Sequence, residues 1–385
     1  MYAAAGAATA AATTPLGPPE EPKATNKHTL CGYGWSDVTN SLLKAIGAAD
    51  MVRALRWSAE LVCSEQGLGR LEATLLHGWA LHVGPALPTW PRSWYTTITQ
   101  IRSMWEKANG DTRTIRNVPL VRQIVAESVA TLVLAAKKPL PTLPTAADCF
   151  KEAETIRSRM RSGGGVGDQV ATRRVWSAGS DGADLRTVGN EFEAALRSAD
   201  SRMYFWIVWL MTLDKQDDAP PARERGPPAV SVKQRKSLVW FLVALLREIA
   251  NEGAFLSVED RNGMFGILET CWVKLGEKGR RDLLAAFATC IQDHLQRRGS
   301  ISLTGSLAAP AASAVRAATM SLDSIYTGIA EEARRYRLEV PRIAGLAPAA
   351  ASGAGAATAA ATATARPAPK LDSMDKLALA YSLLG

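Results

Sequence analysis

Basic side chains flank a glycine-rich stretch in the middle of the chain. Three arginines precede it, and two more arginines and a tryptophan follow it: Arg157, Arg159, Arg161, Arg173, Arg174 and Trp176. Guanidinium groups bind phosphates, and an aromatic ring can stack on an unpaired base. The pattern predicts a nucleic-acid-binding surface, with solvated surface charge as the alternative interpretation.

A second basic set is formed by Lys233, Arg235 and Lys236, just before a strongly apolar segment. The whole chain carries a formal net charge of +8, which permits contact with an acidic partner. We therefore add these three residues to the predicted surface and expect DNA or RNA as its ligand.

The stretch "RALRWSAELVCS" (53–64) combines charged, aromatic and thiol side chains on one predicted helix. At 100° per residue, Arg53, Arg56 and Glu60 fall on one narrow polar stripe, and most of the remaining circumference is apolar. A helix that is apolar around most of its circumference is buried among neighbours. We therefore expect the stripe to position neighbouring helices or a protein partner, and not a substrate.

Linear motifs of catalysis are not found. The cluster "SGGGVGDQ" is not followed by the Lys-Ser/Thr of a phosphate-binding loop, and no G-x-S-x-G occurs. His77 and His82 are five residues apart and do not share a helix face. We predict no catalytic residues, no metal site and no cofactor. The alternative is an enzyme assembled from scattered polar residues without a linear motif.

The five cysteines are odd in number and widely spaced, unlike the even, closely spaced set of a disulfide framework. They indicate buried thiols in a reducing, intracellular compartment.

The last residues, "KLDSMDKLALAYSLLG", form a short amphipathic segment after an Ala-, Thr-, Gly- and Pro-rich linker. On a helix its large side chains gather on one side: Leu371, Met374, Leu377, Tyr381 and Leu384. A helix on a flexible tether is typical of a peptide that binds a groove in a protein partner. Docking back onto the chain's own helices is the alternative.

Helix signals recur along the chain and strand signals do not, so we expect an all-α, two-lobed helical bundle. The apolar runs "MYFWIVWLM" and "LVWFLVALL" are far shorter than the ~20 residues that span a bilayer, and they predict buried helices. The predicted parts are a disordered N-terminal tail (1–29), a first lobe (30–160), a Gly-rich loop (161–183), a second lobe (184–340), a disordered linker (345–370) and the tail helix (371–385).

Four segments carry a resemblance: "RWSAELVCS", "RLEATLLHGWALHVGPALPTWP", "RNVPLVRQIVAE" and "LAAKKPLP". Within residues 49–141 they resemble uncharacterised helical proteins of nucleocytoplasmic large DNA viruses. A more remote likeness is to the collar helices of clamp-loader-like ATPases, but no nucleotide-binding motif accompanies it, and no ATPase activity is implied. The viral resemblance implies a location in the host nucleus, the cytoplasm or the virion.

These features together predict a non-enzymatic helical interaction or assembly protein, associated with nucleic acid in viral replication or packaging. The expected partners are a protein that binds the C-terminal helix and DNA or RNA; a homo-oligomer is also compatible with the pattern. A structural virion component, either minor capsid or core, is the alternative.

Overall fold

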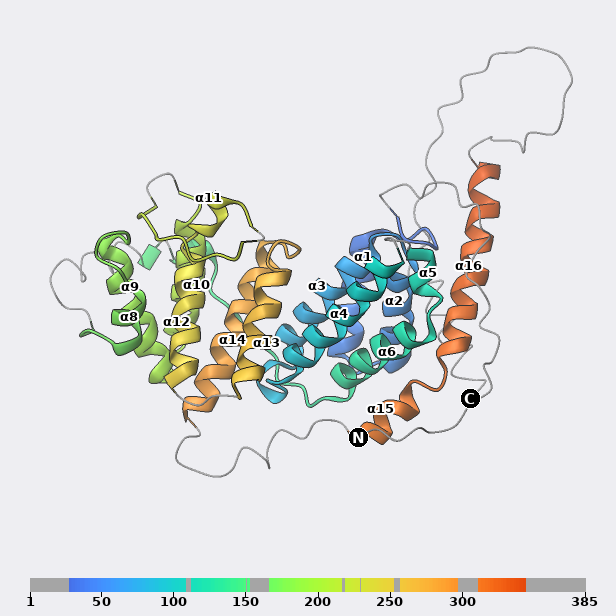
Figure 1. The fold of residues 1–385 in the computed structure, drawn as a ribbon, viewed down its shortest axis with the longest axis horizontal. Helices are drawn as coiled ribbons and strands as arrows, with labels where there is room; N and C mark the ends of the chain where they lie inside the picture. The colour runs from blue at the N-terminus through green and yellow to red at the C-terminus, as the bar shows by residue number, and fades with distance from the viewer. Residues whose placement is uncertain are drawn as a thin grey trace, which may run out of the picture. The chain divides into compact units, whose positions relative to one another are not determined.

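The computed structural model describes residues 28–108, 112–149, 151–152, 166–216, 219–228, 230–252, 257–296 and 311–343. Within these ranges the chain is all-α, as predicted, and contains no β-strand beyond one isolated bridge between His28 and Gly34 (Figure 1). The linker 345–370 and the tail helix 371–385 lie outside the described residues. So does the predicted N-terminal tail, except for its last two residues, which belong to the bridge and the turn that follows it.

The described residues form two compact units, each built from separate stretches of sequence. Unit 1 takes its residues from 28–71, 101–133 and 311–343, and unit 2 from 72–100 and 134–296. The predicted lobes, 30–160 and 184–340, were continuous in sequence, and the division in the structure differs from them. The difference arises because the last described helix packs against the second one, and because residues 72–100 contact helices from the second half of the chain.

Unit 1 is a bundle in which α2 is the central helix and packs against α1, α5 and α16. Its helices are α1 (Trp35–Gly47), α2 (Met51–Cys63), α5 (Thr112–Arg116), α6 (Pro119–Leu134), α15 (Ala312–Ala318) and α16 (Leu322–Ile343). The carboxylate of Asp50 accepts a hydrogen bond from the backbone N–H of Arg53 at 3.1 Å, so a capping residue fixes where α2 begins. The indole of Trp57 meets the ring of Tyr33 edge to face at 5.4 Å.

Two of the described helices have several residues in each unit, and α6 has only its last residue, Leu134, in unit 2. The helix α3 (Gly67–His82) passes from unit 1 to unit 2 after Leu71, and α4 (Trp90–Lys107) passes back after Gln100.

Unit 2 holds the remaining elements around an aromatic core. They are η1 (Gly84–Ala86), α8 (Val170–Val175), α9 (Ala183–Arg197), α10 (Arg202–Leu213), α11 (Val232–Arg235), α12 (Val239–Glu252), α13 (Val258–Cys271) and α14 (Glu277–Gln296). Every residue of α10 except Arg202 and Thr212 is buried, which confirms that "MYFWIVWLM" is a core helix. Trp79 and Phe265 both contact Phe287, with ring centroids 5.5 and 5.9 Å apart. None of the described helices combines the length and hydropathy that crossing a membrane requires.

Candidate functional site

Two residues of the polar stripe on α2, Arg56 and Glu60, form ion pairs and hydrogen bonds inside unit 1. We call the group of Cys31, Tyr33, Arg56, Glu60 and Glu332 the junction. Arg56 donates from Nη1 to Glu60 Oε2 at 3.0 Å and from Nη2 to Glu332 Oε2, on α16, at 2.6 Å. The Glu60 side chain is completely buried, and its other oxygen accepts the backbone N–H of Cys31 at 2.9 Å. The hydroxyl of Tyr33 donates to Glu332. One guanidinium therefore links α2 to α16, and Glu60 fixes the N-terminal segment beside them.

The conformation of residues 28–34 is determined by a tight turn that contains a glycine. The backbone N–H of Thr29 donates to Tyr33 O at 2.9 Å, which closes a tight turn. Gly32 lies in that turn with φ at +85°, a conformation that favours glycine, and the ring of Tyr336 lies directly against it. Any side chain at this position would collide with the Tyr336 ring of α16.

Burial and charge set the protonation states in the junction. Burial and the neighbouring carboxylates of Glu60 and Glu332 raise the pKa of the Cys31 thiol well above its usual value. Burial and the hydrogen bond to Glu332 likewise raise the pKa of Tyr33. Burial lowers the pKa of Arg56, but the charges of Glu60 and Glu332 outweigh that effect and raise it overall. At neutral pH the thiol and phenol are therefore neutral and the guanidinium is charged.

Arg53 does not join the junction. Arg53 lies one turn before Arg56. Its side chain is 49% exposed and forms an ion pair with Asp50 at 3.4 Å. The predicted stripe is divided into an exposed end and a buried end.

A second arginine contact between helices of unit 1 was not predicted. The guanidinium of Arg122, on α6, lies 4.2 Å from the centre of the Tyr326 ring on α16, and its Nε donates to Arg116 O at 2.7 Å. Arg116 in turn donates to Cys63 O at 3.1 Å. Arg122 is buried among the apolar side chains of α6, and no local pattern in the sequence separates it from the exposed polar residues of the same helix.

The arginines around the glycine-rich stretch are only partly described. Arg157, Arg159 and Arg161 lie outside the described residues. Arg173 is exposed, whereas Arg174 binds Glu248 at 2.8 Å and Glu252 at 3.3 Å, both on α12. Arg174 is therefore largely neutralised by contacts between helices.

Trp176 has structural contacts. Its indole N–H donates to Gly182 O at 3.1 Å, and the guanidinium of Arg186 lies 5.1 Å from its ring centre. One polar atom and one ring face are thus already engaged, although Trp176 remains half-buried.

The second basic set flanks the short helix α11. Arg235 pairs with Glu224 at 2.8 Å, while Lys233 and Lys236 are exposed. Ser231 and Gln234 cap α11 reciprocally. The structure therefore presents Lys233, Lys236 and Arg173 to solvent, and the other described cations of the predicted surface have acidic or aromatic neighbours.

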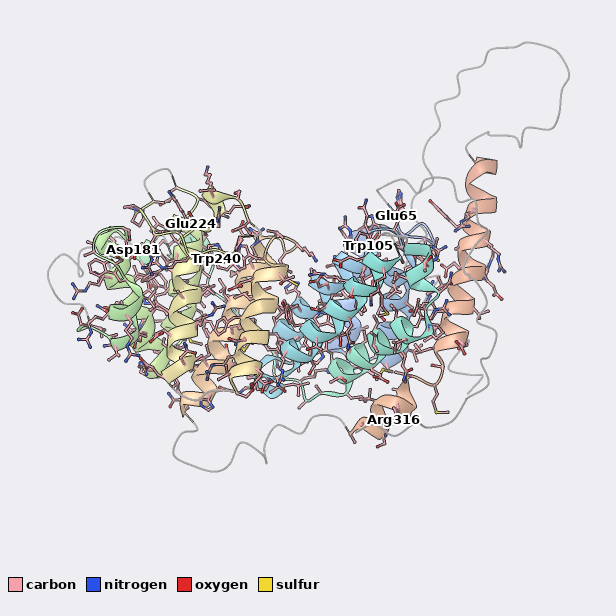
Figure 2. All side chains as sticks on the ribbon, in the orientation of Figure 1. Glu65, Trp105, Asp181, Glu224, Trp240 and Arg316 are labelled. Carbon is pink, nitrogen blue, oxygen red and sulfur yellow. The ribbon has the colours of Figure 1, made fainter. Side chains whose placement is uncertain are left out.

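Unit 2 contains a buried ion pair that the sequence did not reveal. Asp181 is fully buried and accepts hydrogen bonds from the backbone of Ser177 at 2.9 Å and Arg223 at 2.8 Å, and from both terminal nitrogens of Arg225. Figure 2 labels Asp181, together with Glu224 and Trp240 from the neighbouring segments. The pair joins residues 219–228 to the loop before α9.

Asp181 gives a pH-dependent prediction. Burial alone would raise its pKa, but the bonds from Arg225 and the two backbone amides lower it below its usual range. The charged Asp181 carboxylate therefore stabilises the folded state fully at pH values above the ordinary aspartate pKa of about 3.9. This stabilisation is lost as the pH falls through the lower, folded-state pKa. We expect Asp181→Asn to cost about 1.5–3 kcal/mol at pH 7 and progressively less towards pH 3, measured by urea unfolding.

Asp184→Asn is the matched control, because Asp184 is an exposed carboxylate on the first turn of α9. A cost of Asp181→Asn that did not change with pH would show that the charge of Asp181 is not what stabilises the loop.

The cysteines lie in the cores of the units, and His77 is half-buried beside a buried carboxylate. All five cysteines are free and buried. Burial raises the pKa of Cys63 to about 12 and that of Cys149 to about 11. His77 Nε2 lies 3.1 Å from Asp282 Oδ2. Among the described residues no group of three or more His, Cys, Asp or Glu side chains could hold a metal ion.

Comparisons of the chain with protein-family models, with curated proteins and with solved structures find no match. The viral and clamp-loader resemblances of residues 49–141 stay predictions. The partner residues Leu371, Met374, Leu377, Tyr381 and Leu384 lie outside the described residues.

Proposed function

We propose that this chain is a non-enzymatic helical interaction or assembly protein. The observation that supports the proposal best is how its buried carboxylates are used. Glu60, Glu193 and Asp181 are each fixed by an arginine and by backbone N–H groups of another segment. Carboxylates held in this way connect helices, whereas a general acid or base needs access to a substrate proton.

Partner recognition is assigned, within this proposal, to the amphipathic residues 371–384. A linker of about 25 residues gives them a root-mean-square reach of roughly 25–30 Å, enough to bind a groove on another protein. Apolar anchors spaced three and four residues apart suit a helix-in-groove interaction.

Nucleic acid is the second candidate ligand, and the exposure of Arg173, Lys233 and Lys236 favours it. The three cations are few, and they lie on α8 and in or directly after α11, so we expect weak binding with a modest salt dependence. A role in viral replication or packaging, or as a virion component, belongs to the same proposal, and copurification with capsids distinguishes the virion role.

Deleting residues 370–385 tests the partner proposal. We expect the truncated chain to keep the melting temperature of the full chain and to lose the protein that the full chain captures reproducibly from native cells. The experiment is an affinity pull-down run in parallel with and without nuclease, beside thermal unfolding of both chains.

Each outcome has a separate meaning. A lower melting temperature after deletion would show that the segment docks on its own helices. Capture that survives deletion would contradict the assigned segment, and capture that nuclease abolishes would show that nucleic acid bridges the two proteins.

A further inference from the structure

The helix α16 is attached to unit 1 by a small apolar surface. It is 22 residues long, yet its fully buried side chains among those described are only Tyr326, Ile329, Ala330 and Ala333. Two of these are alanines, which bury little apolar area. Ile325 and Tyr336 add half-buried contacts, and the Tyr336 ring lies against Gly32. In α2, by contrast, every residue from Trp57 to Cys63 is buried. Figure 1 shows the C-terminal turns of α16 extending beyond the other helices of this unit.

Polar contacts supply much of the remaining attachment. We call Tyr33, Arg56 and Glu332 the clasp, since both Tyr33 and Arg56 donate to the carboxylate of Glu332. Glu332 is already 22% exposed in the docked helix. Arg122 adds its contact with the Tyr326 ring.

When the bonds of the clasp break, no buried charge is left without an oppositely charged partner. If α16 leaves, Arg56 keeps its bond to Glu60, and Glu332 moves into water, where a carboxylate is well solvated. An unpaired buried charge is the usual reason why breaking an internal ion pair is costly. That cost does not arise here, because the buried acid and the buried base remain on α2 together.

A cysteine lies directly beneath the helix. Cys31 is 2% exposed, and its thiol donates to Ile329 O of α16 at 3.6 Å. Cys149, Cys271 and Cys290 belong to unit 2. Reaction of Cys31 with a thiol reagent therefore reports on α16, and the three cysteines of unit 2 report on unfolding elsewhere.

We propose that α16 is a releasable strap, which detaches from α2 as one piece while α1 and α2 stay folded. Its release uncovers the surface formed by α2 and residues 28–34, including Cys31. Opening of a weakly held element below the energy of global unfolding is a general property of folded proteins. In this chain the clasp sets the frequency of opening.

Thiol labelling of the full chain under native conditions tests the strap. Peptide mapping by mass spectrometry gives the labelling rate of each cysteine with iodoacetamide. We expect Glu332→Gln to raise the rate at Cys31 about tenfold or more, as loss of a hydrogen bond to a charged group would, and to leave Cys271 and Cys290 unchanged. Glu331→Gln, at the neighbouring exposed position, is the matched control and should leave all rates unchanged.

Tyr33→Phe is a second variant, because it removes the hydroxyl of the clasp and keeps the ring on Trp57. Amide hydrogen exchange provides a readout independent of thiol chemistry: peptides of α16 should exchange ahead of peptides of α1 and α2. Exchange of α16 and α2 at one common rate would overturn the proposal, as would a Cys31 rate that is equal in Glu332→Gln and Glu331→Gln.

Discussion

Replacing Arg56 with methionine is expected to lower the free energy of unfolding of unit 1 by about 3–5 kcal/mol. Methionine has a similar length but cannot pair with Glu60, whose side chain is completely buried beside it. The backbone N–H of Cys31 would then be the remaining donor to Glu60 among the bonds described above. Urea unfolding followed by circular dichroism measures the loss.

Two further variants separate the charge from general damage to the helix. Arg53→Met removes a guanidinium from the exposed end of the same stripe, and we expect a change within about 0.5 kcal/mol. Arg56→Met combined with Glu60→Met removes both charges, and part of the lost stability should return. If the single and double variants were equally unstable, the unpaired carboxylate would not be the cause.

Replacing Glu193 with alanine is expected to cost about 3–5 kcal/mol in unit 2. Its fully buried carboxylate accepts the backbone N–H groups of Ala171 at 3.2 Å and Thr172 at 2.8 Å, in the first turn of α8. The same carboxylate accepts two hydrogen bonds from Arg197. Without it α8 loses the cap for its unpaired amides, and amide exchange in residues 170–175 should accelerate together with the loss of global stability.

Glu248→Ala is the control for Glu193→Ala. Glu248 also binds an arginine, Arg174, but the arginine is 56% exposed. Surface pairs of this kind contribute about 0–1 kcal/mol. Equal effects of the two substitutions would contradict the capping role of Glu193.

The all-α class and the buried helix "MYFWIVWLM" followed from local signals in the sequence. The polar stripe of α2, formed by Arg53, Arg56 and Glu60, was placed on one helix face before any neighbour was known. Such features depend on residues a few positions apart, where helix geometry is fixed.

The partners of those residues could not be predicted in the same way. Glu332 is 276 positions from Arg56, and no local pattern links the two. For the same reason, Arg174 could be interpreted as a phosphate ligand, since its acidic neighbours are on α12, more than 70 positions away. Ion pairs between distant helices are decided by packing, which a single sequence does not display.

The contact between the start of the described chain and its last helix has a consequence for biosynthesis. Cys31 and Ile329 are 298 positions apart. At about 5–20 residues per second, a ribosome needs roughly 15–60 s to make the chain between them. For most of that interval α2 is complete but has no α16 to pack against, while all of unit 2 is being synthesised. Unit 1 therefore begins folding first and finishes last, and a nascent chain released early would leave Cys31 open to solvent.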